Sequence, residues 1–539
     1  MSEQRPAGFA ITRRRIIGAA VAAAIAGSRI ALAQSAAPGP LRRVVASEMT
    51  SLDPLRPTGQ VTFEMGAELF QGLTAYDARG QLTDGCAASW AMSSDGLIWT
   101  FKLKPNLRWS DGRELTAADF VYSIRRLLSP ETGAAQASRF DAIRNARLVR
   151  VGKLPTEQLG VTAPDARTVR FELEQPDVDL PIMTSIAYCV PEHVIRVHGR
   201  EWTRPGNMVT SGPYTVESWA PAVKIVKLRR NPYFHEAASV AIERVEWLTG
   251  YDDATRLRLF RVGEVDVVTV EDPINLSLAR RDLASRLRGG PDSRLGAIGL
   301  NLQHKPLQDP RLRRALSLAI DRRVLTAKVR ALDERAWEGV LPPGMRDLSI
   351  PQLPEHAAWP MPRRLAEARQ LAAAAGVSAA QPLTLGIGFP IPNPLAQKTY
   401  LAVAAMWRAL GVTAQLQPLE GRAYIPALEK KQFQVFSYNS FATVPVASFF
   451  LDRFVSDATT NYGSYRSEAY DRAFGDGEKQ LSAAARVEGF RSAERILLQD
   501  LPLLPLFSGA SHRLISARVR GWVDHPNQAH PSRFLSIAS

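Results

Sequence analysis

The chain has 539 residues, 45% of them hydrophobic and 22% charged, which allows a large buried core and excludes a disordered or fibrous protein. At the usual domain size this length predicts two to four domains. The formal net charge is +14, and residues 1–33 hold five arginines against one glutamate, which leaves +10. The remaining basic residues occur mostly as separated pairs, which are typical of solvated helix surfaces, so no nucleic-acid partner is expected. Four such pairs are Arg125-Arg126, Arg229-Arg230, Arg322-Arg323 and Arg363-Arg364.

The first 33 residues are predicted to be an export signal. Arginines 13 to 15 precede an apolar run that ends near Gly27 and is too short to span a bilayer. Ala31-Leu32-Ala33 then offers a cleavage site. An arginine pair followed by two large apolar residues favours a twin-arginine signal over an ordinary secretory signal. No cysteine for a lipid anchor and no later run of transmembrane length follow, so we expect a periplasmic protein that is soluble after cleavage.

The chain contains two cysteines, Cys86 and Cys189. A disulfide between them is possible in an oxidising compartment. Cys86 lies in LTDGCAASW, where a small buried residue would suffice, so two separate buried thiols are the favoured interpretation.

The predicted elements begin with a strand over residues 41–46, a turn at Leu52-Asp53-Pro54 and a helix over residues 63–73. The most regular unit follows between Gly96 and Leu128. Alternating apolar residues predict a strand over residues 97–103, and a second strand is expected to begin at Leu107 and Trp109. Thr116 can cap a helix with Asp119 in a capping box. The apolar face of that helix would consist of Val121, Ile124, Leu127 and Leu128.

Later elements alternate helix and strand. A helix over residues 255–260 precedes a strand over residues 265–268. Asp309 can cap a helix that starts at Pro310 and continues to Val324, with Arg311, Arg313 and Arg314 on its outer face. A buried strand is expected over residues 501–507. Other helices are predicted over residues 363–375, 395–410, 466–474 and 483–499.

Several motifs resemble those of one known family. The unit after Gly96 carries W-T-F-x-L, W-S-D-G and L-T-A-x-D-F-V-Y-S, and further matches occur at Ser211-Gly212-Pro213-Tyr214, Asn231-Pro232 and Leu341-Pro342-Pro343-Gly344. In this order, from about residue 41 to about residue 525, the motifs resemble the family 5 extracellular solute-binding proteins, the oligopeptide- and dipeptide-binding components of ABC importers.

The resemblance implies an α/β fold, a two-lobed periplasmic-binding-protein-like (type II) clamshell with an extra subdomain in the first lobe. Lobe I would span residues 34–294, with the subdomain at about 75–205, and lobe II residues 295–505. Residues 506–539 would return to lobe I, and the hinge would lie near residues 292–298 and 505–510. The implied function is capture of a peptide or peptide-like solute and its delivery to an ABC permease in the inner membrane, by a protein expected to be a monomer.

Enzyme signatures are absent from the sequence: it contains no H-E-x-x-H, paired C-x-x-C, G-x-S-x-G or phosphate-binding loop. Asp252-Asp253 and Glu271-Asp272 are expected to serve as helix caps and surface groups. His525 and His530 are close in sequence, but a solvated C-terminal tail is favoured over a metal site. No catalytic residue, metal or cofactor is therefore expected. An exported hydrolase on a two-lobed scaffold is the alternative.

The family's contact regions correspond here to Thr58, Gly59, Gln60, Gln136, Tyr438, Asn439, Ser440, Phe441, Ala442, Thr443 and Phe507. Two of these depart from the family pattern, since Ser440 stands where tryptophan is expected and Thr443 where aspartate holds the ligand's α-ammonium. A buried ammonium without a carboxylate costs several kcal/mol. Asp452 or another carboxylate could replace the missing aspartate. Otherwise the resemblance leaves open a modified peptide, an opine-like conjugate or a sugar-like solute.

Overall fold

The computed structural model describes residues 39–49, 51–56, 60–134, 136–220, 224–348, 350–441, 446–526 and 529–538. Its main feature is a mixed sheet in which the strands follow the order β15-β14-β16-β12-β17-β11-β1-β10-β9-β8, with β13 paired to β17. The strands are β15 (Val412–Glu420), β14 (Leu383–Ile391), β16 (Val435–Phe441), β12 (Leu287–Leu300), β17 (Leu503–Ile515), β11 (Val267–Thr269), β1 (Leu41–Val44), β10 (Arg244–Leu248), β9 (Ile225–Arg230), β8 (Tyr214–Ser218) and β13 (Arg335–Ala336).

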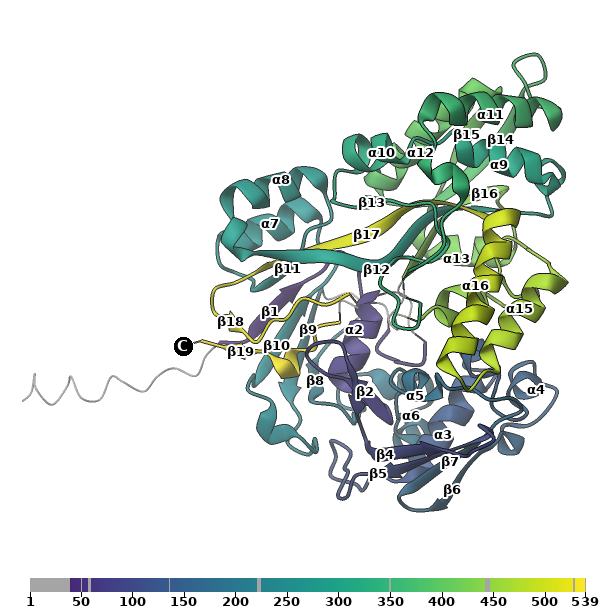
Figure 1. Ribbon diagram of the computed structural model, residues 1–539. Coiled ribbons are helices and arrows are strands. Elements are labelled where there is room, and N and C mark those ends of the chain that lie inside the picture. The colour runs from purple at the N-terminus through teal and green to yellow at the C-terminus, as the bar shows by residue number, and fades with distance from the viewer. Residues whose placement is uncertain are drawn as a thin grey trace, which may run out of the picture.

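Two long antiparallel strands, β12 and β17, run through both halves of this sheet (Figure 1). Their register extends from Leu287 opposite Leu514 to Gly299 opposite Leu503, with irregularities after Pro291 and after Gly296. At one end β17 pairs with β11, and at the other β12 pairs with β16. The two strands therefore connect the two lobes of the molecule.

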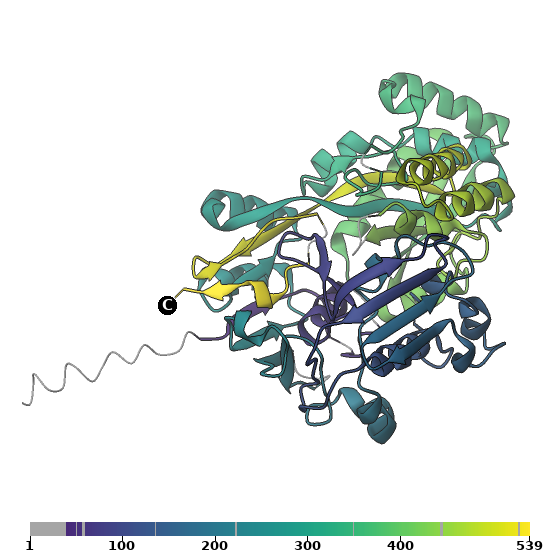
Figure 2. The ribbon, with the colours of Figure 1, turned by 60° about the horizontal axis from the view of Figure 1, so that its bottom comes forward.

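The first lobe contains β1, β8 to β11, α2 (Gln60–Leu69), α7 (Asp253–Arg261) and α8 (Pro273–Asp282). A separate four-stranded sheet, β4-β5-β7-β6, forms its extra subdomain, which Figure 2 brings forward. These strands are β4 (Ala87–Met92), β5 (Ile98–Leu103), β7 (Thr168–Glu172) and β6 (Val161–Asp165), preceded by the hairpin of β2 (Thr74–Tyr76) and β3 (Leu82–Asp84). Their helices are α3 (Ala117–Leu128), α4 (Ala146–Arg150), α5 (Leu180–Met183) and α6 (Glu192–His198).

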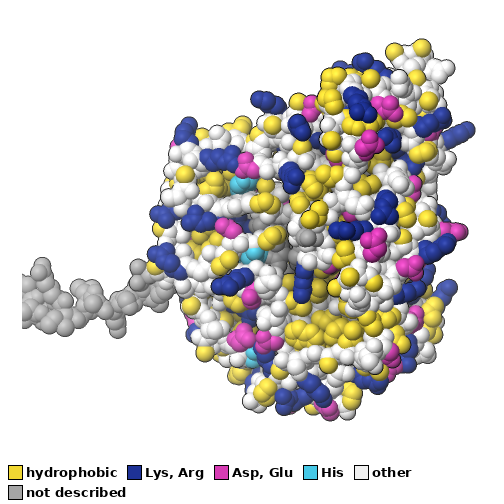
Figure 3. Space-filling view, in the orientation of Figure 1, with side chains coloured by type: hydrophobic (Ala, Val, Ile, Leu, Met, Phe, Trp, Pro, Cys, Tyr) yellow, Lys and Arg dark blue, Asp and Glu magenta, His cyan; other side chains and the backbone are white. Residues whose placement is uncertain are grey.

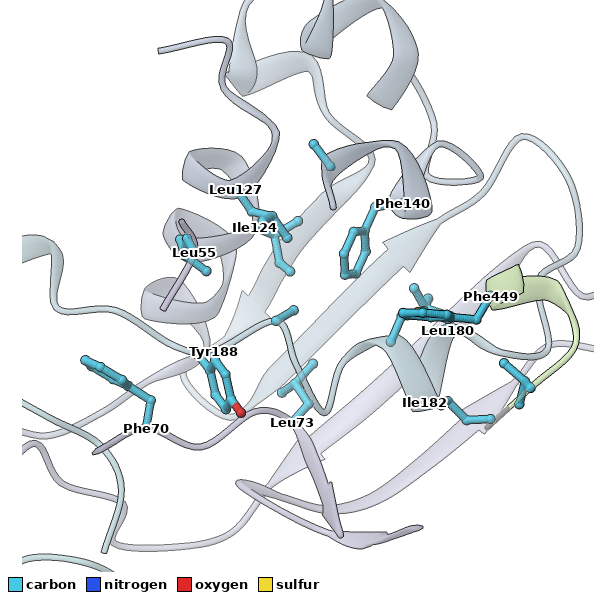
Figure 4. Packing of buried hydrophobic residues seen from close by; sticks show 14 of the residues in the cluster. Leu55, Phe70, Leu73, Ile124, Leu127, Phe140, Leu180, Ile182, Tyr188 and Phe449 are labelled. Carbon is cyan, nitrogen blue, oxygen red and sulfur yellow. The ribbon is translucent and has the colours of Figure 1, made fainter. Parts of the chain in front are cut away.

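The second lobe surrounds β14 to β16 with helices, and α15 and α16 extend from it over the extra subdomain (Figure 1). The helices are α9 (Pro310–Leu318), α10 (Arg322–Val324), α11 (Met361–Ala374), α12 (Pro394–Trp407), α13 (Gly421–Glu429), α14 (Ser448–Leu451), α15 (Glu468–Glu478) and α16 (Ala483–Asp500). Figure 4 shows Phe449 of this lobe beside Leu180 of the first, within one buried apolar cluster. The prediction of a two-lobed α/β fold with an extra subdomain is confirmed.

The unit after Gly96 forms largely as predicted. Trp99, Phe101 and Leu103 of β5 are buried, and the backbone N–H of Thr116 donates to Asp119 Oδ2 at 2.8 Å in the predicted capping box. The prediction of a second strand is wrong. Residues 107–115 instead form a tight turn, in which Arg108 and Glu114 make one isolated antiparallel β-bridge. Gly112 has a φ of +87°, so the chain reverses too soon for a ladder to form.

The predicted helix from Pro310 to Val324 is interrupted. Asp309 caps α9 as predicted, accepting from the Arg311 N–H at 2.8 Å, but Asp321 caps a separate helix by accepting from Val324 N–H at 3.0 Å. Arg313 does not face solvent as predicted. It is 6% exposed because its guanidinium donates to the carbonyl oxygens of Leu307, Gln308 and Asp500.

The prediction that the arginine pairs are solvated is wrong for one arginine in each of three pairs. Arg322 and Arg364 are 3% and 5% exposed and share the carboxylate of Glu338, while Arg126 binds Asp53. Neighbouring residues on a helix point about 100° apart, so one of two arginines can turn inward when a buried carboxylate faces it. On the face drawn in Figure 3, the visible Lys and Arg side chains are scattered among acidic ones rather than gathered in a stripe.

Cys86 and Cys189 are free and buried, which confirms the prediction of two separate thiols. The side chains of Asp252 and Asp272 cap α7 and α8, as expected of these acidic pairs. His525 and His530 are not in a solvated tail. Both are about 7% exposed, with ring centroids 4.4 Å apart, and His530 stacks on Trp522 at 4.1 Å.

Within the described ranges, no cluster of three or more His, Cys, Asp or Glu side chains is arranged to hold a metal ion. Among the helices of the described residues, none combines the length and apolarity needed to cross a membrane.

Candidate functional site

A cleft beside α2 contains about 820 Å³ of space free of protein atoms, part of it open to solvent. Most of its described lining residues come from the first lobe, whereas Phe441 comes from the end of β16 in the second. The cleft therefore lies where the two lobes meet. Its lining consists of Phe63, Glu64, Ala67, Phe70, Gln71, Gly72, Thr74, Ala75, Tyr76, Ser185, Ile186, Tyr188, Pro213, Phe441, Ala529, Pro531 and Arg533.

Local packing explains why α2 presents this wall. Phe63, Glu64 and Ala67 lie on one side of the helix because residues three and four apart share a face. Tyr188 packs closely against the helix at Gly66, where an added Cβ would lie 2.7 Å from the tyrosine ring. Figure 4 shows Phe70 and Tyr188 side by side, and their ring centroids lie 6.4 Å apart. Aromatic rings therefore form much of the cleft surface.

One acidic side chain among the described lining residues, Glu64, sits between two arginines. Its carboxylate oxygens lie 3.8 Å from Arg43 Nη2 and 3.7 Å from Arg513 Nη2. One turn further along α2, Glu68 is fully buried and accepts from the Ser532 N–H at 2.9 Å and from the Ser532 hydroxyl at 2.7 Å. Burial raises the pKa of Glu68, and Arg43 and Ser532 partly offset that rise.

The basic side chain of the described lining is Arg533, in the short helical turn η11 (Ser532–Phe534). Its Nη1 donates to Glu236 Oε2 at 2.8 Å. Burial lowers the pKa of Arg533, although Glu236 opposes this effect. Nearby, His235 Nε2 lies 2.6 Å from Gln71 Oε1, and burial lowers the pKa of His235 to about 4, so this ring is neutral at pH 7.

Polar contacts across the lobes lie next to the cleft, in the region of α15 and α16. Arg486 of α16 forms an ion pair with Asp179 of the first lobe, and the Ser448 hydroxyl donates to the same carboxylate at 2.9 Å. Arg139 Nη1 lies 2.9 Å from Asp452 Oδ2 and its guanidinium covers the ring of Phe449. These contacts join the lobes in a closed arrangement.

The structure brings one predicted site residue, Phe441, into the cleft. Asn439 is exposed, and its Nδ2 donates to Ser437 Oγ at 3.2 Å. Ser440 is buried, and Tyr438 lines a second, smaller pocket with Arg453 and Tyr462. A ligand role for these three residues remains a prediction.

The other predicted positions do not line the described part of the cleft. Gln136 is half-buried and precedes the turn η1 (Ala137–Phe140), and Gln60 begins α2. Phe507 is buried, with the Arg330 guanidinium 3.9 Å from its ring centroid. Thr58, Gly59, Ala442 and Thr443 lie outside the described residues. Their contact with a ligand also remains a prediction.

Sequence reasoning missed Glu64, Tyr188 and Arg533. Each lies in a segment whose local pattern is that of an ordinary helix, loop or tail, and they meet only in three dimensions. A weak signal exists for Glu64, because two glutamates one turn apart are unusual on a helix whose other residues are mostly apolar.

A cleft between two lobes that are connected by a pair of long strands defines a protein that captures a solute by closing around it. The model of the bacterial extracellular solute-binding proteins, family 5 (middle), matches residues 81–462, and the chain belongs to this family. It is 31% identical to the periplasmic oligopeptide-binding protein OppA of Salmonella typhimurium, over 95% of this chain and 96% of the relative. The solved structure of Burkholderia pseudomallei OppA is 29% identical, with a TM-score of 0.87 over 94% of this chain and 100% of that chain.

Two solved structures of MppA bear on the lobe arrangement. The structure of the Escherichia coli murein tripeptide-binding protein MppA is 28% identical, with a TM-score of 0.86 over 93% of this chain and 99% of that chain. The structure described as the unliganded open form of MppA is 29% identical, with a TM-score of 0.72 over 93% of this chain and 98% of that chain. The lobes of this chain therefore lie nearer to the first arrangement than to the open form.

Proposed function

We propose that this protein captures a short peptide or peptide-like solute between its lobes and delivers it to an ABC permease of the inner membrane. The observation that carries the proposal is the composition of the interlobe cleft, whose described lining combines aromatic and aliphatic walls with the carboxylate of Glu64 and the guanidinium of Arg533. The names of the relatives, which bind oligopeptides or a murein tripeptide, support the same class of ligand.

The apolar walls favour a peptide with apolar side chains over a sugar-like solute. Phe63, Phe70, Tyr188 and Phe441 offer ring surfaces but few hydrogen-bonding groups. A peptide can bury apolar side chains against these rings, whereas a sugar-like solute carries no comparable apolar side chain. No observation favours the alternative of an exported hydrolase.

Glu64 is our candidate for the carboxylate that pairs with the ligand's ammonium. Thr443 cannot supply a charge, and Asp452 does not line the cleft. Glu64 lines it, and shares its charge with Arg43 and Arg513. A carboxylate that lines the cleft reduces the objection to peptides with a free N-terminus, because an opposite charge then faces the ligand's ammonium, although Arg43 and Arg513 share that charge.

Closure follows from contact with both lobes. A solute held by Phe441 of the second lobe and by α2 of the first binds the closed form better than the open form, and so increases the closed population. We assign residues 34–294 and 506–539 to the first lobe, with the subdomain at about 75–205, and residues 295–505 to the second. Export to the periplasm by a twin-arginine signal in residues 1–33 and a monomeric state belong to the same proposal.

Calorimetry with tri- to pentapeptides, sugars and opines tests this function. We expect peptides to bind, and Glu64→Gln to weaken binding of a free-amine peptide by about 10- to 100-fold, the range of a lost charge-assisted hydrogen bond. The N-acetylated form of the same peptide should lose far less. Glu217→Gln, on β8, is the matched control and should leave both affinities unchanged. Tight binding of a sugar in place of every peptide would overturn the proposal.

A further inference from the structure

The C-terminal segment forms one wall of the cleft and is held there by buried contacts. Glu68 of α2 accepts two hydrogen bonds from Ser532, and Arg43 Nη1 donates to the His530 carbonyl oxygen at 2.7 Å. Arg43, Glu68 and Ser532 are all buried. The residue that follows Ser532 is therefore placed against the cleft by the fold rather than by chance orientation of a tail.

Arg533 occupies that position, with 9% of its side chain exposed. Its ion-pair partner, Glu236, is 38% exposed and lies 3.2 Å from a second cation, Lys104 Nζ. The guanidinium also lies 4.3 Å from the ring centroid of Phe534. The cation is thus buried at the cleft, and the carboxylate paired with it is partly exposed and shared with Lys104, while the charges of Glu68 and Asp84 also act on it.

Guanidinium chemistry indicates which ligand group suits this position. An arginine presents five N–H donors in a planar fork, which pairs with carboxylates through two parallel hydrogen bonds. One of these donors is accounted for by Glu236. An anionic group in the cleft would give the remaining N–H donors of Arg533 a second partner.

We propose that Arg533 receives a carboxylate of the bound solute and so determines specificity for acidic or free-acid ligands. This inference rests on the proposed peptide-binding function. The carboxylate can come from the C-terminus of a peptide or from an aspartate or glutamate side chain, and both share the same chemistry toward Arg533.

The test uses the full mature chain and two equimolar tripeptide libraries, one of free acids and one of C-terminal amides. Peptides retained by the protein are identified by mass spectrometry, and the best one is titrated by calorimetry as acid and as amide. If the C-terminus is the source, the wild type should prefer the acid by about 10- to 100-fold. If a side chain is the source, the amide library should yield peptides enriched in Asp or Glu. In either case Arg533→Gln should abolish the preference and Arg533→Lys should retain part of it.

Two further variants separate recognition from folding. Arg518→Gln is the matched control, because Arg518 also forms an ion pair in the C-terminal region, with Asp266, but does not line the cleft. Glu236→Gln should keep the preference for a carboxylate, since Arg533 remains. Peptide binding by the wild type without any preference for a carboxylate, or an equal loss of acid and amide binding in Arg533→Gln, would overturn the inference and leave the peptide function standing. Failure to retain any peptide would overturn both.

Discussion

At the scale of single residues, the most consequential feature is a set of buried charged side chains. Composition alone would place them on the surface. Glu338 accepts from Arg364 Nη1 at 2.6 Å and Nη2 at 3.0 Å, and lies 3.2 Å from His356 Nε2 and 3.5 Å from Arg322 Nη1. Burial by itself would raise the pKa of Glu338, but Arg322, His356 and Arg364 together lower it. The carboxylate therefore stays ionised and joins three segments of the second lobe.

Replacing the Glu338 carboxylate with a neutral group should destabilise the folded protein. In Glu338→Gln, two buried guanidinium groups lose their counter-charge, and we expect a loss of about 3–5 kcal/mol in the free energy of unfolding. Urea unfolding followed by tryptophan fluorescence measures it. Glu243→Gln is the control, since Glu243 pairs with Arg230 but is 59% exposed, and should cost less than about 0.5 kcal/mol. Equal losses in the two variants would contradict this account.

At the scale of elements, β12 fits between its neighbours β16 and β17 because it carries glycine where their aromatic rings cross it. A Cβ at Gly296 would overlap the ring of Phe507, and one at Gly299 would overlap the ring of Phe436. The glycines thus let the side chains of neighbouring strands lie flat on the β12 backbone. The predicted hinge near residues 292–298 includes Gly296.

Gly296→Ala should therefore destabilise the protein. The new methyl group meets a buried aromatic ring that has little room to move, so we expect a loss of about 1–3 kcal/mol in unfolding free energy, measured by urea titration. Gly290→Ala, on the same strand, adds a methyl group where no atom lies within 4 Å and provides the control. Gly290→Ala should be neutral or slightly stabilising. If Gly296→Ala were equally well tolerated, this packing role for the glycine would be wrong.

At the scale of the whole molecule, closure gathers carboxylates around one arginine. Arg486 contacts Asp179 of the first lobe and lies 3.1 Å from Glu478 Oε1 of its own lobe, while Asp177 and Asp347 are close by. Burial raises the pKa of Glu478 to about 8, with Arg486 partly offsetting it, and burial and Asp179 raise the pKa of Asp177 to about 6.

These shifts predict that ligand affinity falls as the pH rises. In an opened molecule the exposed Glu478 would titrate near its ordinary pKa of about 4.3. The closed form holds the proton more tightly, so the stabilisation is fully present below about pH 4.3 and is lost as the pH rises through about 8. We expect Kd for a bound peptide to increase about tenfold or more between pH 5.5 and pH 8.

Glu478→Gln should flatten that dependence, because the neutral amide has no proton to lose. Glu488→Gln, at an exposed position of α16, is the control and should keep the wild-type slope. Titration of the ligand itself is the same for all three proteins, so the ratio of their Kd values isolates Glu478. A slope that persists in Glu478→Gln would assign the pH dependence to another group.

Much of the fold follows from local sequence signals. The capping box of Thr116 and Asp119, the Asp309 cap before Pro310 and the alternation of Trp99, Phe101 and Leu103 each depend on residues a few positions apart, and each is found in the structure. Where local signals failed, a distant partner decided the outcome. Arg313 turns inward because carbonyl groups near Leu307 and at Asp500 accept its hydrogen bonds.

The motifs along the chain were enough to determine the family and the two-lobed architecture. Each motif is a local packing unit whose residues must occur at fixed spacing. The composition of the cleft was decided only by the tertiary structure. Glu64 of α2, Tyr188 after α5, Phe441 at the end of β16 and Arg533 near the C-terminus are distant in sequence, and long-range strand pairing and lobe closure bring them together. Side-chain burial and ion-pair partners depend on that closure, and so does the chemistry offered to a ligand.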